Sequence, residues 1–137
     1  MVSLSVKSKY GLSAIFELAL HVNQGPIQIR HLAETGHIPQ NFLEQILVEL
    51  KRFGLVQSTR GAHGGYALAK KPAEITVKDV LLCLEGPSEL STGYCGCKVL
   101  TRYWKSVDEK IQEEFNVTFQ ALVEEKQKAD KLLTYSI

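Results

Sequence analysis

The chain has 137 residues, of which 45% are apolar and 23% charged, and its formal net charge is +1. This length and apolar content suit one globular domain, with room for an appended helical arm. No apolar run reaches the roughly 20 residues that cross a bilayer, and the amino terminus lacks a signal-peptide core, so we expect a cytoplasmic protein without a membrane partner.

Charge is divided unevenly between the two halves of the chain. Residues 1–71 carry eight Lys and Arg against four Asp and Glu, which gives +4, whereas residues 72–137 carry eight against eleven, which gives −3. All four histidines also lie in the first half. A basic half is typical of a nucleic-acid surface, although an excess of this size also arises by chance.

Three helices are expected before residue 54, over about residues 8–22, 28–35 and 39–53, with stops at residues 23–26 and at Gly36. Pro39 suits the start of the third helix, where its missing N–H is harmless. The expected inward positions are Gly11, Ala14, Ile15, Leu18, Ala19 and Val22, then Ile29, Leu32 and Ala33, then Phe42, Leu43, Ile46, Leu47, Leu50 and Phe53. A helix, a glycine turn and a longer helix in this order predict a helix-turn-helix.

The third predicted helix has a polar side that suits the major groove of DNA. Gln40, Asn41, Glu44 and Lys51 are spaced to project away from the apolar stripe. Asn and Gln can pair with adenine edges, Glu can accept from cytosine, and Lys can meet a phosphate. An ordinary solvated helix face is the alternative, and the segment that follows weighs against it.

A glycine-rich, basic segment follows this helix. Residues 60–66 (RGAHGGY) lie between short apolar runs at residues 55–56 and 66–68, which predicts a β-hairpin. Arg60 and His63 place nitrogen donors at its tip. Gly61, Gly64 and Gly65 can adopt positive φ and leave no Cβ to collide with a phosphate backbone. We expect this hairpin to be a DNA-contacting wing.

The second half contains helices of another kind. Thr76 and Asp79 form an expected capping box for a helix that buries Val77, Val80, Leu81 and Leu84 and ends at residues 86–87. A loop over residues 88–97 precedes a long helix from Lys98, and Phe119, Leu122 and Val123 suggest a last helix before a mobile tail. The apolar stripe of the long helix comprises Leu100, Tyr103, Trp104, Val107, Ile111 and Phe115. A second copy of the chain is the economical cover for this stripe, and packing against the same chain is the alternative.

Six segments together resemble the Rrf2 family of bacterial winged-helix repressors: residues 4–10 (LSVKSKY), 38–47 (IPQNFLEQIL), 54–56 (GLV), 60–66 (RGAHGGY), 75–77 (ITV) and 84–87 (LEGP). The resemblance implies a mainly α-helical fold with a small β-hairpin wing, in which a winged helix-turn-helix precedes a long dimerisation helix. It also implies a dimeric regulator that binds double-stranded operator DNA, with the third helix in the major groove and Arg60 leading the wing into the minor groove.

The same resemblance places candidate DNA contacts on individual residues. Asn41 and Glu44 match base-reading positions, and Lys7 and Lys9 lie near phosphate contacts. The complete set of expected DNA contacts is Lys7, Lys9, Gln28, Pro39, Gln40, Asn41, Glu44, Lys51, Arg60, Gly61, His63, Gly64 and Gly65. The chain divides accordingly into a DNA-binding domain (residues 1–87), a cysteine-containing sensor loop (88–97) and a dimerisation helix with a carboxyl-terminal arm (98–137).

The cysteines depart from the pattern of the family's cluster-binding members, which have three in the loop before the long helix. Here that loop holds only Cys95 and Cys97, and Cys83 lies in a helix where it suits a small core residue. Two thiolates do not complete the four-ligand shell of an iron–sulfur cluster. A cluster, with 2Fe–2S favoured, would need His31 or His37, a carboxylate such as Glu85 or Glu89, or ligands from a second subunit.

Other forms of control stay open. Cys97 begins the long helix beside Lys98, which favours its thiolate, and Cys95 could act as a resolving thiol in a redox switch. Control by a bound regulatory protein is a further alternative, as is a different class of protein: a winged-helix interaction module or a thiol redox module. The sequence shows no nucleophile with a paired base and no phosphate loop, so we do not expect an enzyme.

Overall fold

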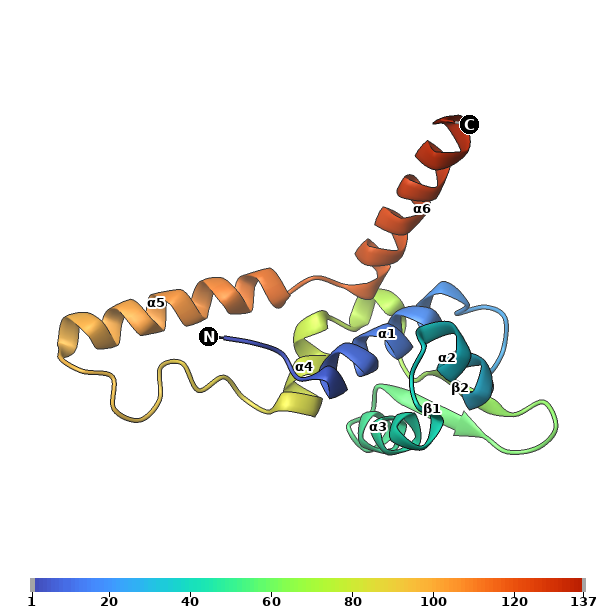
Figure 1. Cartoon of the computed structure of the whole chain (residues 1–137), viewed down its shortest axis with the longest axis horizontal. Coiled ribbons are helices and arrows are strands. Elements are labelled where there is room, and N and C mark those ends of the chain that lie inside the picture. Colours follow the sequence, from blue (N-terminus) through green and yellow to red (C-terminus); the bar gives the residue numbers. More distant parts are fainter. Residues whose placement is uncertain (1, 137) are drawn as a thin grey trace.

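The computed structural model describes residues 2–136, which form a helical body with two helices extending from it (Figure 1). The elements in chain order are α1 (Val6–Leu20), α2 (Ile29–Gly36), α3 (Gln40–Arg52), β1 (Val56–Thr59), β2 (Gly65–Leu68), the 3₁₀ turn η1 (Pro72–Glu74), α4 (Val77–Glu85), α5 (Lys98–Phe115) and α6 (Phe119–Ser136). The predicted fold class, mainly α with one small antiparallel hairpin, is confirmed.

One apolar core holds the first four helices and the hairpin together. It gathers the buried side chains of α1, α2, α3 and α4 with Leu55 and Val56 at the start of the hairpin. Phe119 and Val123 of α6 are buried in the same cluster, so the last helix closes the core that the first half builds. Burying large apolar side chains in this way is the main stabilising contribution to such a fold.

The predicted helices are confirmed with small shifts at their ends. Val22 and Phe53, expected inside, are each 46% exposed. Val22 lies past the His21 cap of α1, and Phe53 is itself the residue that caps α3, so neither continues the helical stripe. Pro39 precedes α3 as its amino-terminal cap instead of being its first helical residue.

The wing consists of β1, β2 and the turn between them, residues 56–68. Val56 pairs with Leu68 and Thr59 with Gly65, in antiparallel register. Ile27, just before α2, adds a further bridge, because its N–H and carbonyl both bond to Tyr66 at 2.8 Å. The wing is thus fixed to the helix-turn-helix along its second strand.

The wing glycines differ in why they are needed. Gly61 and Gly65 have positive φ, as predicted for them, whereas Gly64 does not. A Cβ on Gly64 would collide with the carbonyl oxygen of Thr59, and one on Gly65 with the carbonyl oxygen of Ile27. Only Gly61 faces open space, so Gly64 and Gly65 are required by the chain's own backbone rather than by the approach of a ligand.

We therefore expect Gly65→Ala to destabilise the wing more than Gly61→Ala does. Both substitutions place alanine at positive φ, at a cost of about 1–3 kcal/mol, and only Gly65→Ala also pushes against Ile27. Thermal unfolding and amide exchange at Ile27 and Tyr66 would measure the difference. Equal effects of the two alanines would contradict this explanation.

The segments before α4 and α6 hold each other in place. Thr76 and Asp79 form the predicted capping box: the Asp79 N–H donates to Thr76 Oγ1 at 3.1 Å and the Thr76 N–H to Asp79 Oδ2 at 3.0 Å. Val77 N–H bonds to Val117 O, and Phe119 N–H bonds to Ile75 O, both at 2.9 Å. This short pairing positions Phe119 so that its side chain packs in the core.

The helices α5 and α6 leave most of their surface uncovered within the single chain. None of the 18 residues of α5 is buried. The helix α6 runs to Ser136 and projects from the body (Figure 1), so the segment expected as a tail is helical over residues 124–136. Alanine, glutamate and lysine, which favour helices, explain why this segment is helical without a core contact.

Candidate nucleic-acid interface

The helix α3 has one buried side and one exposed side. Its buried residues are Leu43, Ile46, Leu47 and Leu50. The four residues predicted to project outward, Gln40, Asn41, Glu44 and Lys51, are all exposed. The side chains of one helix can therefore reach a groove while its opposite side anchors it in the core.

Three further residues on α3 were missed in the sequence. Gln45, Val48 and Arg52 are exposed, and together with Asn41 they point away from the buried stripe. A rotation of about 100° per residue would have placed them opposite Leu43 and Leu47. We call Asn41, Gln45, Val48 and Arg52 the outer face of α3.

Side-chain contacts set the position of the wing relative to the helix-turn-helix. Lys51 at the end of α3 donates to Ser58 Oγ on β1 at 2.6 Å. Gln28, the residue that precedes α2, donates through Nε2 to the Ala62 carbonyl at 3.5 Å. Both residues were predicted to contact DNA; in this structure Lys51 joins α3 to the wing, and Gln28 joins the start of α2 to it.

The tip of the wing is open to solvent. Arg60, Gly61, Ala62 and His63 are exposed, and the Gly64 N–H closes the turn on the Gly61 carbonyl at 3.0 Å. Within residues 2–136, the guanidinium of Arg60 has no ion pair or hydrogen bond. A cation held free at the end of a rigid hairpin is suited to a phosphate or to the minor groove.

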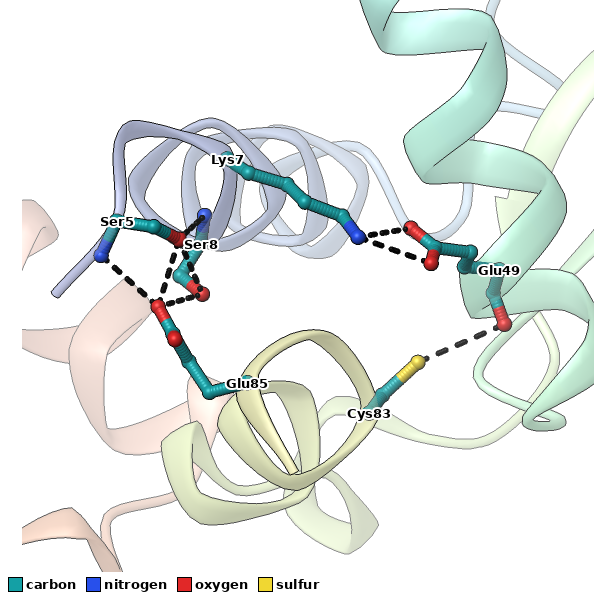
Figure 2. Close-up of polar contacts among 6 residues, drawn as sticks. All are labelled: Ser5, Lys7, Ser8, Glu49, Cys83 and Glu85. Atoms are coloured by element: carbon teal, nitrogen blue, oxygen red, sulfur yellow. Dashed lines mark hydrogen bonds and ion pairs between the residues drawn. The ribbon is translucent and has the colours of Figure 1, made fainter. Parts of the chain in front are cut away.

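Lys7 and Lys9, predicted near phosphates, differ in their surroundings. The Lys7 ammonium lies 2.8 Å from Glu49 Oε2 and 2.9 Å from Oε1, joining α1 to α3 (Figure 2). Lys9 is exposed. The Lys7–Glu49 pair is partly solvent-accessible, so its contribution to the stability of the fold is small. Its main effect is on the orientation of α1 relative to α3.

A carboxylate at the end of α4 caps the start of α1. Glu85 Oε1 accepts from the Ser5 N–H at 2.9 Å, Ser5 Oγ at 2.6 Å and Ser8 Oγ at 2.7 Å (Figure 2). The hydrogen bonds from Ser5 and then Ser8 hold the pKa of Glu85 below its usual value. Glu85, one of the carboxylates considered as a cluster ligand, is thus engaged with α1.

The three cysteines occupy different environments. Cys97 is exposed at the start of α5, where the backbone N–H groups of Leu100 and Val99 lower its pKa without closing a full cap hydrogen bond. Cys95 is half-buried, with its Sγ 3.5 Å from the Gly93 carbonyl. Cys83 packs against the core and donates to the Glu49 carbonyl at 3.5 Å, and burial raises its pKa.

The pH dependence of alkylation should separate these thiols. Because its pKa is lowered, Cys97 keeps its thiolate to lower pH, so iodoacetamide should modify it at a pH where Cys83 is still protonated. Peptide mass mapping across pH would measure this, with Cys97→Ser as the control. A midpoint for Cys97 at or above that of a free thiol would contradict the assignment.

The histidines considered as cluster ligands lie far from the cysteines. His31 and His37 belong to α2 and its cap, beside the wing, whereas the loop over residues 88–97 reaches the opposite end of the molecule (Figure 1). Among the described residues, no three His, Cys, Asp or Glu side chains form a group able to hold a metal ion. The donors of one chain therefore do not complete a cluster shell.

The predicted dimer stripe of α5 is accessible. Leu100 is 47%, Tyr103 57% and Trp104 37% exposed, and the two aromatic rings meet edge-on with centroids 5.3 Å apart. The other three, Val107, Ile111 and Phe115, are half-buried. Beside the end of the stripe an open cleft of about 790 Å³ lies between α4, α5 and residues 2–4.

No helix within residues 2–136 combines the length and the apolar content that a membrane span requires.

Known proteins share both the sequence and the fold. The model of the Rrf2 family, described as iron-dependent transcriptional regulators, matches residues 4–125. The regulator CymR of Bacillus subtilis is 41% identical over 86 residues, which span 63% of this chain and 62% of that protein. The regulator IscR of Pectobacterium carotovorum is 32% identical over 135 residues, 93% of this chain and 82% of its own.

Two solved structures have the same architecture. CymR, the global cysteine regulator of B. subtilis, has a TM-score of 0.82 and 32% identity, covering 90% of this chain and 98% of its own. IscR of T. potens has a TM-score of 0.82 and 34% identity, covering 93% and 90%. These relatives are transcriptional regulators and not enzymes. With the family model matched over nearly the whole chain, this protein belongs to the Rrf2 family of transcriptional regulators.

Proposed function

We propose that this protein is a cytoplasmic, sequence-specific DNA-binding regulator that acts as a homodimer. The observation that carries the proposal is that α3 has an exposed, polar side and lies beside the wing. The hydrogen bond from Lys51 to Ser58 fixes the wing to α3, and Arg60 at the tip of the wing is exposed. Such a unit can place α3 in the major groove and the wing in the adjacent minor groove.

In this proposal, three segments of the chain have different roles. Residues 1–87 read DNA, residues 88–97 sense a signal, and residues 98–137 pair two copies through the stripe from Leu100 to Phe115. Two copies related by a twofold axis would present their α3 helices to half-sites separated by about one turn of DNA or a multiple of it. Dimerisation then makes operator binding depend on α5.

Selection from random duplexes would test the proposal directly. Several rounds of capture on the full chain should enrich one motif of two inverted half-sites, with centres about 10 base pairs or a multiple apart. Failure to enrich any motif would contradict DNA recognition and favour a winged-helix protein-interaction module. A single half-site would contradict the dimer.

For the signal, we propose thiol or iron–sulfur chemistry at Cys95 and Cys97. The lowered pKa of the exposed Cys97 supports a thiol response, since the thiolate is the reactive form. An iron–sulfur cluster fits less well, because one chain offers only two loop thiolates and its candidate histidines lie elsewhere. A cluster would need ligands from the second subunit.

Iron and sulfide content separates these two routes. Anaerobically isolated protein and a Cys95→Ser/Cys97→Ser variant would be compared, together with their absorption spectra. Stoichiometric iron and visible bands that the variant loses would establish a cluster. Iron-free protein whose DNA affinity changes on oxidation, in the wild type only, would establish the thiol response. Iron-free protein whose DNA affinity does not change on oxidation would favour control by a regulatory protein partner.

A further inference from the structure

Val48 is an apolar residue on the exposed side of α3. Its exposed fraction is 49%, whereas the four buried residues of the same helix, Leu43, Ile46, Leu47 and Leu50, are each at 0%. Single exposed valines are common on protein surfaces, so exposure alone says little. The position of Val48 on the helix carries the argument.

Val48 lies almost directly opposite the core. At about 100° per residue, the direction away from the buried stripe falls between Asn41, Gln45, Val48 and Arg52, the outer face of α3. Two of the other three carry amide groups and one a guanidinium, so Val48 is the only apolar residue of this face. Its neighbours one turn away, Glu44 and Arg52, are also exposed.

The charges around Val48 favour a polyanion over an apolar protein surface. Lys51 and Arg52 lie three and four residues after it, on the last turn of α3, where they can neutralise phosphates beside a groove, whereas the adjacent Glu49 is paired with Lys7. An apolar side chain between hydrogen-bonding residues matches one feature of a major groove. That feature is the 5-methyl group of thymine, the single apolar group among the base edges.

We propose that Val48 contacts the 5-methyl group of a thymine in each operator half-site and is a specificity-determining residue. The inference rests on the proposed function, in which α3 enters the major groove. Asn41 and Glu44, toward the amino-terminal end of α3, would read hydrogen-bonding edges of neighbouring bases in the same groove, while Val48 would add an apolar contact to the thymine methyl group.

The test removes the methyl group from the DNA and its partner from the protein. Operators obtained by selection would be prepared with each thymine replaced in turn by deoxyuridine, and binding measured by fluorescence anisotropy. At one thymine of the half-site, the replacement should weaken the wild type about fourfold, the effect of removing one buried carbon group. Val48→Ala should lose a similar factor on the thymine operator and bind both operators equally.

Gln45→Ala is the matched control, because it truncates a polar residue on the same face. It should keep the preference for thymine over deoxyuridine at the position that Val48 reads. Equal binding of all substituted operators by the wild type would overturn the inference, as would an unchanged preference in Val48→Ala. Failure to select any operator is a different result and would overturn the proposed function as well.

Discussion

Trp104→Asp should convert the protein to a monomer and weaken operator binding by about a hundredfold or more. Trp104 lies at the centre of the accessible stripe of α5, against Tyr103, and a charge there would be buried in the proposed interface. Each monomer would still bind a half-site, but the gain from binding two linked half-sites would be lost. Sedimentation velocity and a binding titration on the same samples would measure both effects.

Arg102→Asp is the control for this substitution. Arg102 is exposed on the side of α5 away from the stripe, so the same new carboxylate there should leave the dimer intact. If Trp104→Asp remained dimeric by sedimentation, α5 would not be the interface. A monomer that bound the operator as tightly as the wild type would instead contradict the need for two reading heads.

Arg60→Ala should weaken operator binding by about 1–3 kcal/mol and reduce selectivity at the base pairs that the wing meets. Arg60 is the only arginine at the tip of the wing, and within the described residues no carboxylate neutralises it. The wing itself should stay folded, because its position depends on Ile27, Tyr66 and Lys51 rather than on Arg60.

Lys126→Ala removes the same charge far from the proposed DNA surface. Lys126 pairs with Asp130 on α6 at 3.0 Å, so its loss should barely change binding. Comparing the two variants separates a contact made by the wing from a general effect of net charge. If Arg60→Ala and Lys126→Ala had equal affinities, the assignment of the wing to DNA would be wrong.

The helices and the hairpin could be predicted from local patterns. Helical spacing of apolar residues, the capping box at Thr76 and Asp79, and the glycines around residues 60–65 each depend on neighbours in the sequence. The pattern failed at helix ends: Val22 continues the spacing but lies past the cap of α1, and Phe53 is itself the cap of α3. Such boundaries depend on where the backbone turns, which spacing alone does not encode.

Contacts between segments far apart in the chain could not be predicted from the sequence. The engagement of Lys7 by Glu49, and of Glu85 by Ser5 and Ser8, joins residues more than 40 positions apart (Figure 2). The sequence predicts that Gly64 and Gly65 lie in a turn. It does not predict that a Cβ on Gly64 would collide with the carbonyl oxygen of Thr59, or one on Gly65 with that of Ile27. Each of these depends on how α1, α3 and the wing pack, which only the folded chain defines.

The exposed side of α3 shows an intermediate case. Asn41 and Glu44 could be predicted from their spacing and from the family resemblance. Gln45, Val48 and Arg52 were not among the predicted contacts, although they lie on the same exposed side as Asn41. The helical period alone was sufficient to find them, once the buried stripe was placed at Leu43, Ile46, Leu47 and Leu50.

The most direct test of the central claim is the salt dependence of binding to the selected operator and to a scrambled duplex of equal length. For a winged-helix dimer, log K should fall linearly with log salt, by about 0.9 per phosphate neutralised, on both duplexes. The operator should bind at least about a thousandfold more tightly near physiological salt. Equal affinity for both duplexes, or binding that does not respond to salt, would contradict sequence-specific DNA recognition by this protein.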